Sequence, residues 1–190
     1  MAINRLEKLQ KAMDFLTVQH GIPGVVVGVT DRKKTISILS SGYSEINTRR
    51  PMTTGSLFEI GSISKSFTAI TLLQLVEKGL LDLSKPVCEY LPIFKVPVAE
   101  KPITTDHLLS HSAGITSGTD LRTEGRYEVY ELRHTQPDSP PGVHYHYSNM
   151  GYRALGLLAE HLYQKPYAQI IREQIFEPLQ MTESYPQITH

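Results

Sequence analysis

The sequence predicts a two-part protein of the α+β or α/β class, with a small sheet-forming part in residues 1–60 and a mainly helical part in residues 61–190. Three observations support this prediction. A helical repeat of apolar residues opens the chain, two runs rich in β-branched residues follow it, and helical repeats dominate the rest. Because two strands alone bury little apolar surface, we expect the sheet to be incomplete within these residues.

The first part begins with a predicted helix. Its apolar residues recur at helical spacing until a glycine and a proline end the pattern: Ile3, Leu6, Leu9, Met13 and Leu16, then Gly21 and Pro23. The stretches "GVVVGVT" and "KTISILSSGYS" predict two strands, which the polar turn "DRKK" joins into a hairpin. The next stretch, "NTRRPMTTGS", contains three threonines together with Pro51 and Gly55, and we expect a loop there.

The second part opens with a predicted helix that starts near Ser62 and ends at Gly79, a residue typical of helix C-termini. Its apolar stripe is expected to face the core: Phe67, Ile70, Leu73 and Val76, reinforced by Leu72 and Leu75. Four further segments are predicted: helices at residues 106–110, 149–163 and 167–175, and a long polar loop at residues 116–143 with room for one more helix.

Composition excludes several classes of function. The 19 lysine and arginine residues balance 19 aspartate and glutamate residues, so no basic face is implied and nucleic acid is not expected as a partner. The single cysteine, Cys88, excludes an internal disulfide, and we expect it to be a small buried residue. No stretch is long and apolar enough to span a bilayer, and the N-terminal segment lacks the apolar run of a signal peptide. The compartment stays open between the cytoplasm and the periplasm or exterior, with a signal removed.

The stretch "GSISKS" places Ser62 three residues before Lys65. Residues three apart share one face of a helix, so the lysine is within reach of the serine hydroxyl. A serine becomes a good nucleophile when a neighbouring base takes its proton, and a lysine with a lowered pKa is such a base. The competing interpretation is a serine that caps the helix, followed by a solvated lysine. Gly61 favours the first interpretation, because it permits a tight turn into the helix.

The stretch "HYHYSNMGY" places Tyr147 and Asn149 just before a strong helical pattern. A tyrosine near a lysine can be held as a phenolate or can relay protons to a leaving group. An asparagine offers both a donor and an acceptor to a substrate amide or to the lysine. The competing interpretation is an asparagine N-cap with a tyrosine that fills the core.

Together the two stretches resemble the motif set of the serine β-lactamase and penicillin-binding protein superfamily, in which Ser-x-x-Lys is the first motif. The Tyr-x-Asn form of the second motif is similar to the class C branch, which includes family VIII carboxylesterases, D-aminopeptidases and DD-peptidase-like proteins. Around both motifs the resemblance extends over nearly the whole chain, in the family's order. It implies the N-terminal part of a two-part β-lactamase-like fold, with later sheet strands and the C-terminal helix missing.

The resemblance also implies roles for the motif residues. Ser62 is then the nucleophile that becomes acylated and supplies one oxyanion N–H, and Lys65 assists its deprotonation. Tyr147 is a general base or proton relay, and Asn149 holds Lys65 and the amide side of the substrate. The implied reaction is acyl-enzyme hydrolysis of a small-molecule amide or ester: a β-lactam, a D-amino-acid peptide or a carboxylic ester. Neither a metal nor another cofactor is required.

Four histidines lie near these motifs. His107 and His111 are four residues apart, but no glutamate stands at the position that a metalloprotease motif requires, so we expect structural roles. His144 and His146 alternate with tyrosines and receive no role.

The family's third motif, Lys-Thr-Gly or His-x-Gly on a later strand, does not occur in the 190 residues. The pair Lys34-Thr35 precedes Ile36 and lies in the early hairpin, so it does not qualify. We therefore expect the N-terminal part of a longer protein, with weak or no turnover on its own. A second copy or a complementary C-terminal segment is expected to cover the apolar face and unpaired edge of the hairpin. The alternative is a non-catalytic binding or regulatory protein on the same fold; a purely structural helical domain leaves the order of the motifs unexplained.

Overall fold

The computed structural model describes residues 2–98, 101–115 and 125–186, with side chains described from residue 5 onward. It divides the chain into two compact units, Met1–Glu59 and Ile60–His190. Part of the loop predicted at residues 116–143, namely residues 116–124, lies outside the described residues.

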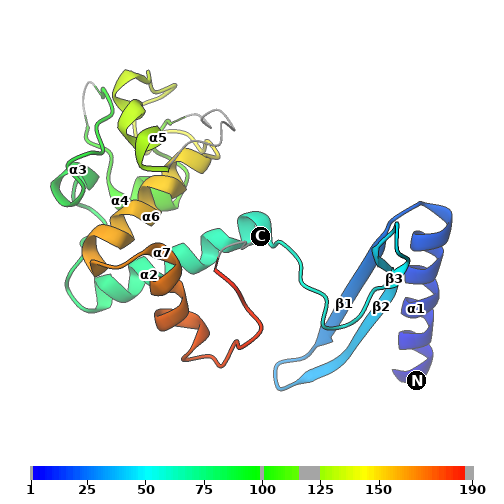
Figure 1. Ribbon diagram of the computed structural model, residues 1–190. Helices are drawn as coiled ribbons and strands as arrows, with labels where there is room; N and C mark the ends of the chain where they lie inside the picture. Colours follow the sequence, from blue (N-terminus) through cyan, green and yellow to red (C-terminus); the bar gives the residue numbers. More distant parts are fainter. Residues whose placement is uncertain (1, 99–100, 116–124, 187–190) are drawn as a thin grey trace. The chain divides into compact units, whose positions relative to one another are not determined.

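Unit 1 contains a helix and a three-stranded antiparallel sheet in the order β1-β2-β3. Its elements are α1 (Ala2–Gln19), β1 (Gly24–Thr30), β2 (Thr35–Glu45) and β3 (Arg50–Pro51). Helix α1 packs along the hairpin, as Figure 1 shows. Polar contacts hold the helix to β2: Ser41 donates a hydrogen bond of 2.7 Å to Asp14 and lies 3.1 Å from the Thr17 hydroxyl. The predicted helix and hairpin are therefore both present.

The predicted loop after β2 contains a short strand that the sequence did not indicate. Arg50 pairs with Glu45, and Pro51 pairs with Tyr43. Strand β3 is an edge strand of the sheet, and an edge is where a proline, which has no N–H to donate, is tolerated.

Little apolar surface is buried inside unit 1. Among its described residues, Met13 is the one buried apolar side chain, at 2% exposure. Large apolar side chains on and after β2 are exposed: Ile36, Ile38, Tyr43 and Ile46. Within the described part of the chain, β1 pairs with β2 alone, so its other edge is unpaired. The expected exposed apolar face and open edge are both confirmed.

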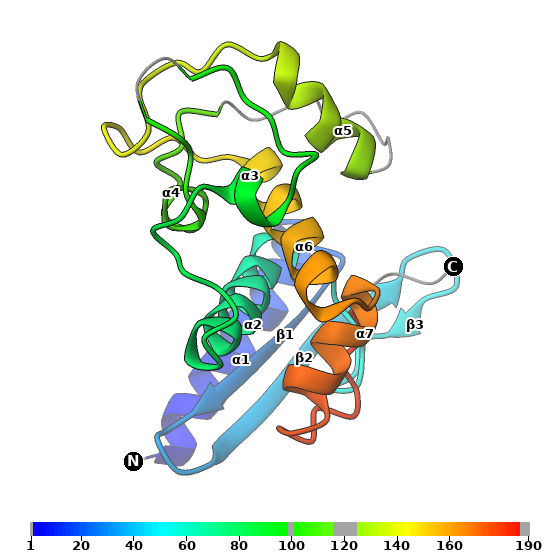
Figure 2. The same cartoon turned by 90° about the vertical axis from the view of Figure 1, so that its left-hand side faces the viewer.

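Unit 2 is built from helices gathered around α6. Its elements are η1 (Gly61–Ile63), α2 (Ser64–Glu77), α3 (Val87–Tyr90), α4 (Thr105–Leu109), α5 (Gly125–Glu131), η2 (Leu132–His134), α6 (Asn149–Tyr163), α7 (Tyr167–Ile171) and the π-helical turn η3 (Arg172–Phe176). Figure 2 shows α6 running between the other helices, and it contacts α2, α3, α4, α5 and α7. Ala154, Leu155 and Leu158 of α6 are fully buried. The helix predicted at residues 149–163 is confirmed with the same bounds.

Helix α2 buries Leu72 and Leu75 as predicted, but the rest of its buried face differs from the prediction. Thr68, Thr71, Leu72 and Leu75 are buried, whereas Ile70 and Leu73 are 47% and 46% exposed. The threonines can be buried because their hydroxyls have partners. Thr71 donates to the Phe67 carbonyl at 2.9 Å, and the Thr68 hydroxyl lies 2.7 Å from the Tyr167 hydroxyl. The predicted inward positions of Ile70 and Leu73 were therefore wrong.

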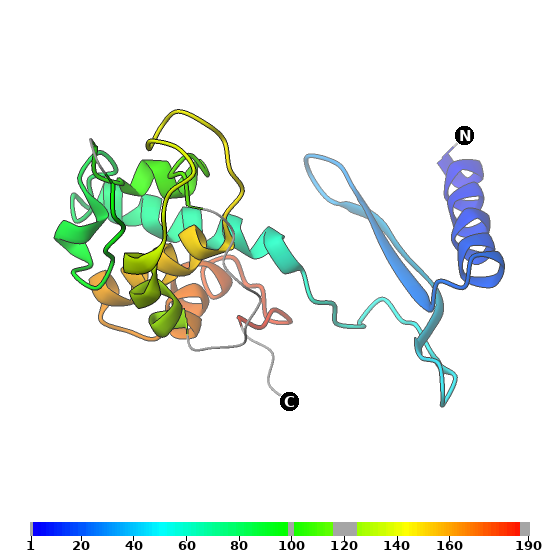
Figure 3. The same cartoon turned by 90° about the horizontal axis from the view of Figure 1, so that it is seen from above.

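Other expectations for unit 2 need smaller corrections. Cys88 is exposed rather than buried, because it lies on the outer side of the short helix α3. The last predicted helix begins at Tyr167 as expected, but after Ile171 it widens into the π-helical turn. Among the described residues, none of the helices combines the length and the apolar character needed to cross a membrane. Figure 3 gives a third view of the helices of unit 2.

The two faces of α2 give a matched test of this packing. Leu72→Ala should lower the free energy of unfolding by about 2–5 kcal/mol, because it leaves a cavity at a fully buried site. Leu73→Ala, the same change at the exposed neighbour, should alter it by less than about 0.5 kcal/mol. Urea unfolding followed by circular dichroism measures both values. Equal losses in the two variants would contradict the burial of Leu72 and the exposure of Leu73.

Candidate active site

Ser62 lies in the 3-10 turn η1 that leads directly into α2. The turn is reached through Gly61, whose φ of +51° is a left-handed conformation that side chains disfavour. The expectation that Gly61 permits a tight turn is confirmed. Lys65 stands in the first turn of α2, so both side chains leave the same end of the helix.

Tyr147 and Asn149 reach the site from the start of α6. Ser148, between them, is the N-cap of that helix, and its hydroxyl accepts a hydrogen bond of 3.0 Å from the Gly151 N–H. The interpretation of Asn149 as the cap was therefore wrong. Because Ser148 satisfies the helix start, the Asn149 amide is left available to other groups.

The structure brings all four predicted site residues together. The Ser62 Oγ lies 2.5 Å from the Tyr147 hydroxyl and accepts a hydrogen bond of 3.1 Å from Lys65 Nζ. Lys65 Nζ also donates to Asn149 Oδ1 at 2.9 Å. The serine hydroxyl is thus within proton-transfer distance of two groups, a phenol and an amine. This arrangement fits the activation of a nucleophile, and a serine that only caps a helix does not require it.

Lys65 controls the electrostatics of the cluster. Its Nζ lies 4.8 Å from the centre of the Tyr147 ring and 5.6 Å from that of Tyr152. Polar interaction with this ammonium, and to a smaller degree with Ser62, holds the pKa of Tyr147 below its ordinary value of 10.0. Burial opposes the shift but does not reverse it. Because the phenolate is stabilised, Tyr147 becomes a base at lower pH than a free tyrosine.

His111, which sequence analysis expected to be structural, packs directly against Tyr147. The two ring centres lie 4.6 Å apart, with 29° between the ring planes. His111 Nδ1 accepts a hydrogen bond of 3.0 Å from the Ser148 N–H. No spacing rule predicts this contact, because the two partners lie 37 residues apart in the chain. Its proximity to the site was missed.

The other histidines do not form a metal site in the described part of the chain, where no three His, Cys, Asp or Glu side chains converge. His107 Nδ1 accepts a hydrogen bond of 3.1 Å from the Thr104 N–H and completes a capping box at the start of α4. That contact confirms the structural role expected for His107. His146 Nε2 lies 3.7 Å from an oxygen of Asp138.

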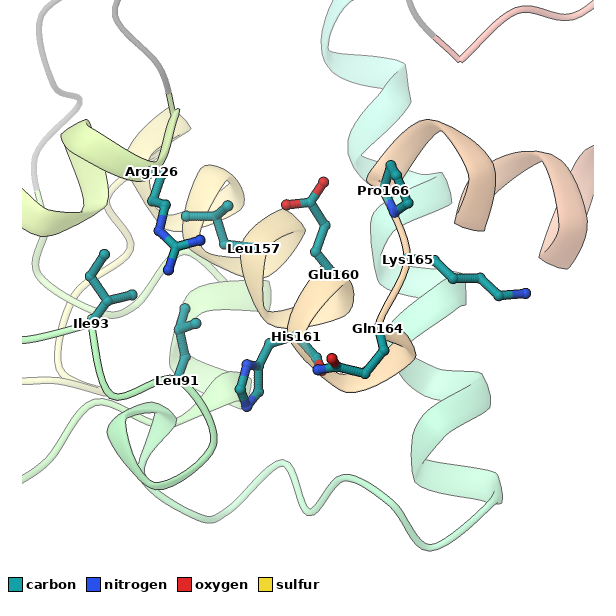
Figure 4. A pocket seen from close by; sticks show the side chains of 9 residues that line it. All are labelled: Leu91, Ile93, Arg126, Leu157, Glu160, His161, Gln164, Lys165 and Pro166. Atoms are coloured by element: carbon teal, nitrogen blue, oxygen red, sulfur yellow. The ribbon is translucent and has the colours of Figure 1, made fainter.

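A separate concavity of about 470 Å³ lies between α5 and the end of α6. Figure 4 shows its charged side chains pointing in different directions rather than toward one point, with Lys165 directed away from the other labelled side chains. Two of them already have structural partners: Glu160 accepts the Tyr167 N–H at 2.8 Å, and Lys165 pairs with Glu173 at 2.5 Å. This concavity therefore lacks the convergent polar groups of a reaction site.

A family model described as Beta-lactamase matches residues 4–186. The chain belongs to the beta-lactamase family. It is 33% identical to penicillin-binding protein 4 of Amycolatopsis lactamdurans over 183 residues, which are 92% of this chain and 48% of that protein. The chain spans about half the length of the curated relatives that it matches.

Two solved structures are similar to this chain in both fold and sequence. The octameric penicillin-binding protein homologue from Pyrococcus abyssi superposes with a TM-score of 0.83 at 28% identity, covering 95% of this chain and 44% of that one. The D-amino acid amidase from Ochrobactrum anthropi SV3, in complex with L-phenylalanine, gives 0.77 at 31% identity, with coverage of 90% and 49%. The resemblance inferred from the two motifs is therefore confirmed, as is an incomplete two-part β-lactamase-like fold.

The electrostatic control by Lys65 can be tested directly. Lys65→Met should raise the pKa of Tyr147 toward 10.0, because the cation that stabilises the phenolate is lost. A pH titration of the tyrosine ring carbons by ¹³C NMR measures this, with the Tyr147 signal assigned by its loss in Tyr147→Phe. Lys78→Met is the matched control, since Lys78 lies over the Tyr163 ring instead. An unchanged Tyr147 titration in Lys65→Met would show that another group sets its pKa.

Proposed function

We propose that this chain carries the nucleophilic centre of a serine hydrolase, with Ser62 as the residue that becomes acylated. The observation that carries the proposal is the position of the Ser62 Oγ, 2.5 Å from the Tyr147 hydroxyl and 3.1 Å from Lys65 Nζ. A serine between a phenol with a lowered pKa and an ammonium has both a proton acceptor and a cation that stabilises the accepting anion. Membership of the beta-lactamase family supports the same assignment.

In the proposed acylation step, Tyr147 acts as a phenolate and takes the proton of Ser62. The Ser62 oxygen then forms a bond to the carbonyl carbon of an amide or ester. When the tetrahedral intermediate collapses, the bond to the leaving nitrogen or oxygen breaks, and Tyr147 returns the proton to that leaving group. Lys65 stays protonated throughout and stabilises the phenolate through charge.

Deacylation reverses these proton movements. Water attacks the acyl carbon while Tyr147 takes one of its protons, and the bond to the Ser62 oxygen breaks. The serine regains its proton from Tyr147, and the acid product leaves. Asn149 keeps Lys65 in place through its Oδ1, which leaves its NH₂ group for the amide side of a substrate. The Ser62 N–H is proposed as one donor to the oxyanion.

The substrate class follows from this chemistry only as far as an amide or ester: a β-lactam, a D-amino-acid peptide or a carboxylic ester. Similarity to a penicillin-binding protein and to a D-amino acid amidase favours amides.

We also propose that a second copy or a complementary segment covers the exposed apolar side chains of unit 1, and the octameric homologue supports self-association. The alternative function, a non-catalytic binding protein, is disfavoured by the hydrogen-bonded contacts among all four site residues.

Covalent labelling tests the nucleophile. A fluorophosphonate should form a bond between phosphorus and the Ser62 oxygen as fluoride leaves, which mass spectrometry detects as an adduct on the peptide that contains Ser62. Ser62→Ala should abolish the adduct, and Tyr147→Phe should slow its formation by about 10²–10⁴-fold, the usual contribution of a general base.

Ser66→Ala, on an exposed serine of the same helix, is the matched control and should label at the original rate. Labelling that is equally fast in Ser62→Ala, or absent in the folded original chain, would favour the non-catalytic alternative.

We expect this chain to be labelled at Ser62 but to hydrolyse esters only slowly in the steady state. The 190 residues contain no Lys-Thr-Gly or His-x-Gly motif after Tyr147, and the loss of one oxyanion donor lowers kcat by about 10²–10³-fold. A steady-state assay of this chain with a nitrophenyl ester should therefore show little Ser62-dependent release of nitrophenol. Brisk release that disappears in Ser62→Ala would overturn this proposal while supporting the nucleophile itself.

A further inference from the structure

His111 occupies a backbone position that favours glycine. Its φ is +58°, a left-handed conformation, and it follows α4 directly after the C-cap residue Ser110. The His111 N–H donates to the Leu108 carbonyl, and the Ser112 N–H donates to the His107 carbonyl. This pair of hydrogen bonds is the Schellman ending of a helix, in which the left-handed residue is usually glycine. A histidine there carries a steric cost that the helix ending itself does not require.

The side chain and carbonyl of His111 instead hold the segment that contains Tyr147. The His111 carbonyl accepts the His146 N–H at 2.6 Å, and its Nδ1 accepts the Ser148 N–H at 3.0 Å. Both neighbours of Tyr147 are therefore bonded to this one residue, while the ring stacks on Tyr147 itself at 4.6 Å.

We propose that His111 is a positioning residue, whose neutral imidazole holds the Tyr147 hydroxyl against Ser62 and Lys65. The inference rests on the proposed function, in which Tyr147 transfers the proton of Ser62. His111 touches neither Ser62 nor a substrate in this scheme; it acts through Tyr147. A backbone N–H must donate to Nδ1, so the neutral ring carries its proton on Nε2.

Protonation of His111 should disable this support. An imidazolium has no lone pair on Nδ1, so the Ser148 N–H would lose its acceptor. It would also place a second cation near Lys65. The titratable groups that face the ring are Lys65 from α2, Tyr145 and Tyr147 from the loop, and Tyr152 from α6. Burial, and then Lys65, lower the pKa of His111 below 6.5, so the neutral form persists to mildly acidic pH.

The lowered pKa of His111 makes the stability of the folded chain depend on pH. Between pH 6.5 and the lower folded pKa of His111, the unfolded chain binds more protons than the folded chain. The stability that the neutral ring supplies is therefore present above pH 6.5 and is lost as the pH falls through the folded pKa.

Two substitutions separate the side chain from the helix ending. His111→Gly and His111→Asn both tolerate the left-handed backbone, so α4 and its ending should stay intact. Asparagine can offer its Oδ1 to the Ser148 N–H but has no ring, whereas glycine removes both contacts. At pH 8, fluorophosphonate labelling of Ser62 should slow by about 5-fold in His111→Asn and about 30-fold in His111→Gly. His134→Asn, on an exposed histidine, should label at the original rate.

NMR gives readouts that do not depend on hydrolase activity. In His111→Gly the Tyr147 pKa should move toward 10.0, because the phenol is no longer held at Lys65. The Ser148 amide shift should titrate with His111 in the original chain and should not do so in His111→Asn.

The outcomes distinguish this inference from the proposed function. If the original chain is not labelled but Tyr147 and Ser148 respond as expected, the function fails and the positioning role stands. If the original chain is labelled and both variants match it in labelling rate and Tyr147 pKa, the positioning role is overturned. Should His111→Gly not fold, His111→Asn alone decides, because its predicted loss of rate and of the Ser148 titration remains measurable.

Discussion

The site depends on one ammonium group, Lys65 Nζ, which joins the starts of two helices. It donates to Ser62 in the turn before α2 and to Asn149 in the first turn of α6, and it stabilises the charge on Tyr147. Hydrogen bonds of this kind weaken steeply when donor and acceptor move apart. The packing of α2 on α6, with fully buried side chains such as Leu72 and Leu155, therefore determines the geometry of the site as well as the stability of the fold. It keeps both acceptors of Lys65, and the Tyr147 ring, within reach of the ammonium.

At the start of α2 and of α6, residues next to the site residues make the turn or cap the helix. Ser148 caps α6, which releases Asn149 to bind Lys65. Gly61 makes the turn before Ser62 in a left-handed conformation, so the nucleophile itself does not have to adopt one. At the end of α4 the left-handed position is occupied by His111 rather than by a glycine. The His111 side chain contacts Tyr147 from that position. Strain at that one residue is consistent with a site that is held by its surroundings.

Local rules predicted what is local in this molecule. The pairing of Ser62 with Lys65 follows from helical spacing, and the strong apolar repeat gave the bounds of α6. The buried face of α2 was not predictable in this way, because Thr68 and Thr71 are buried only where Tyr167 and a backbone carbonyl satisfy their hydroxyls. The contact between His111 and the Ser148 segment depends on partners far apart in the chain, and the exposure of Cys88 depends on which side of α3 faces the core. Such facts come from packing.

The exposure of Tyr147 explains why charge attraction to Lys65 is not enough to orient its ring. Its side chain is 39% exposed, so water competes for the phenol oxygen and screens its attraction to Lys65. A charge interaction alone therefore leaves the ring free to turn away from Ser62. Stacking on the half-buried His111 ring, with backbone hydrogen bonds on both sides of Tyr147, opposes that rotation from the protein side, where water does not compete as strongly. Because one face of the Tyr147 ring is open to water, the contacts that orient the ring have to come from its packed face. That face stacks on the His111 ring.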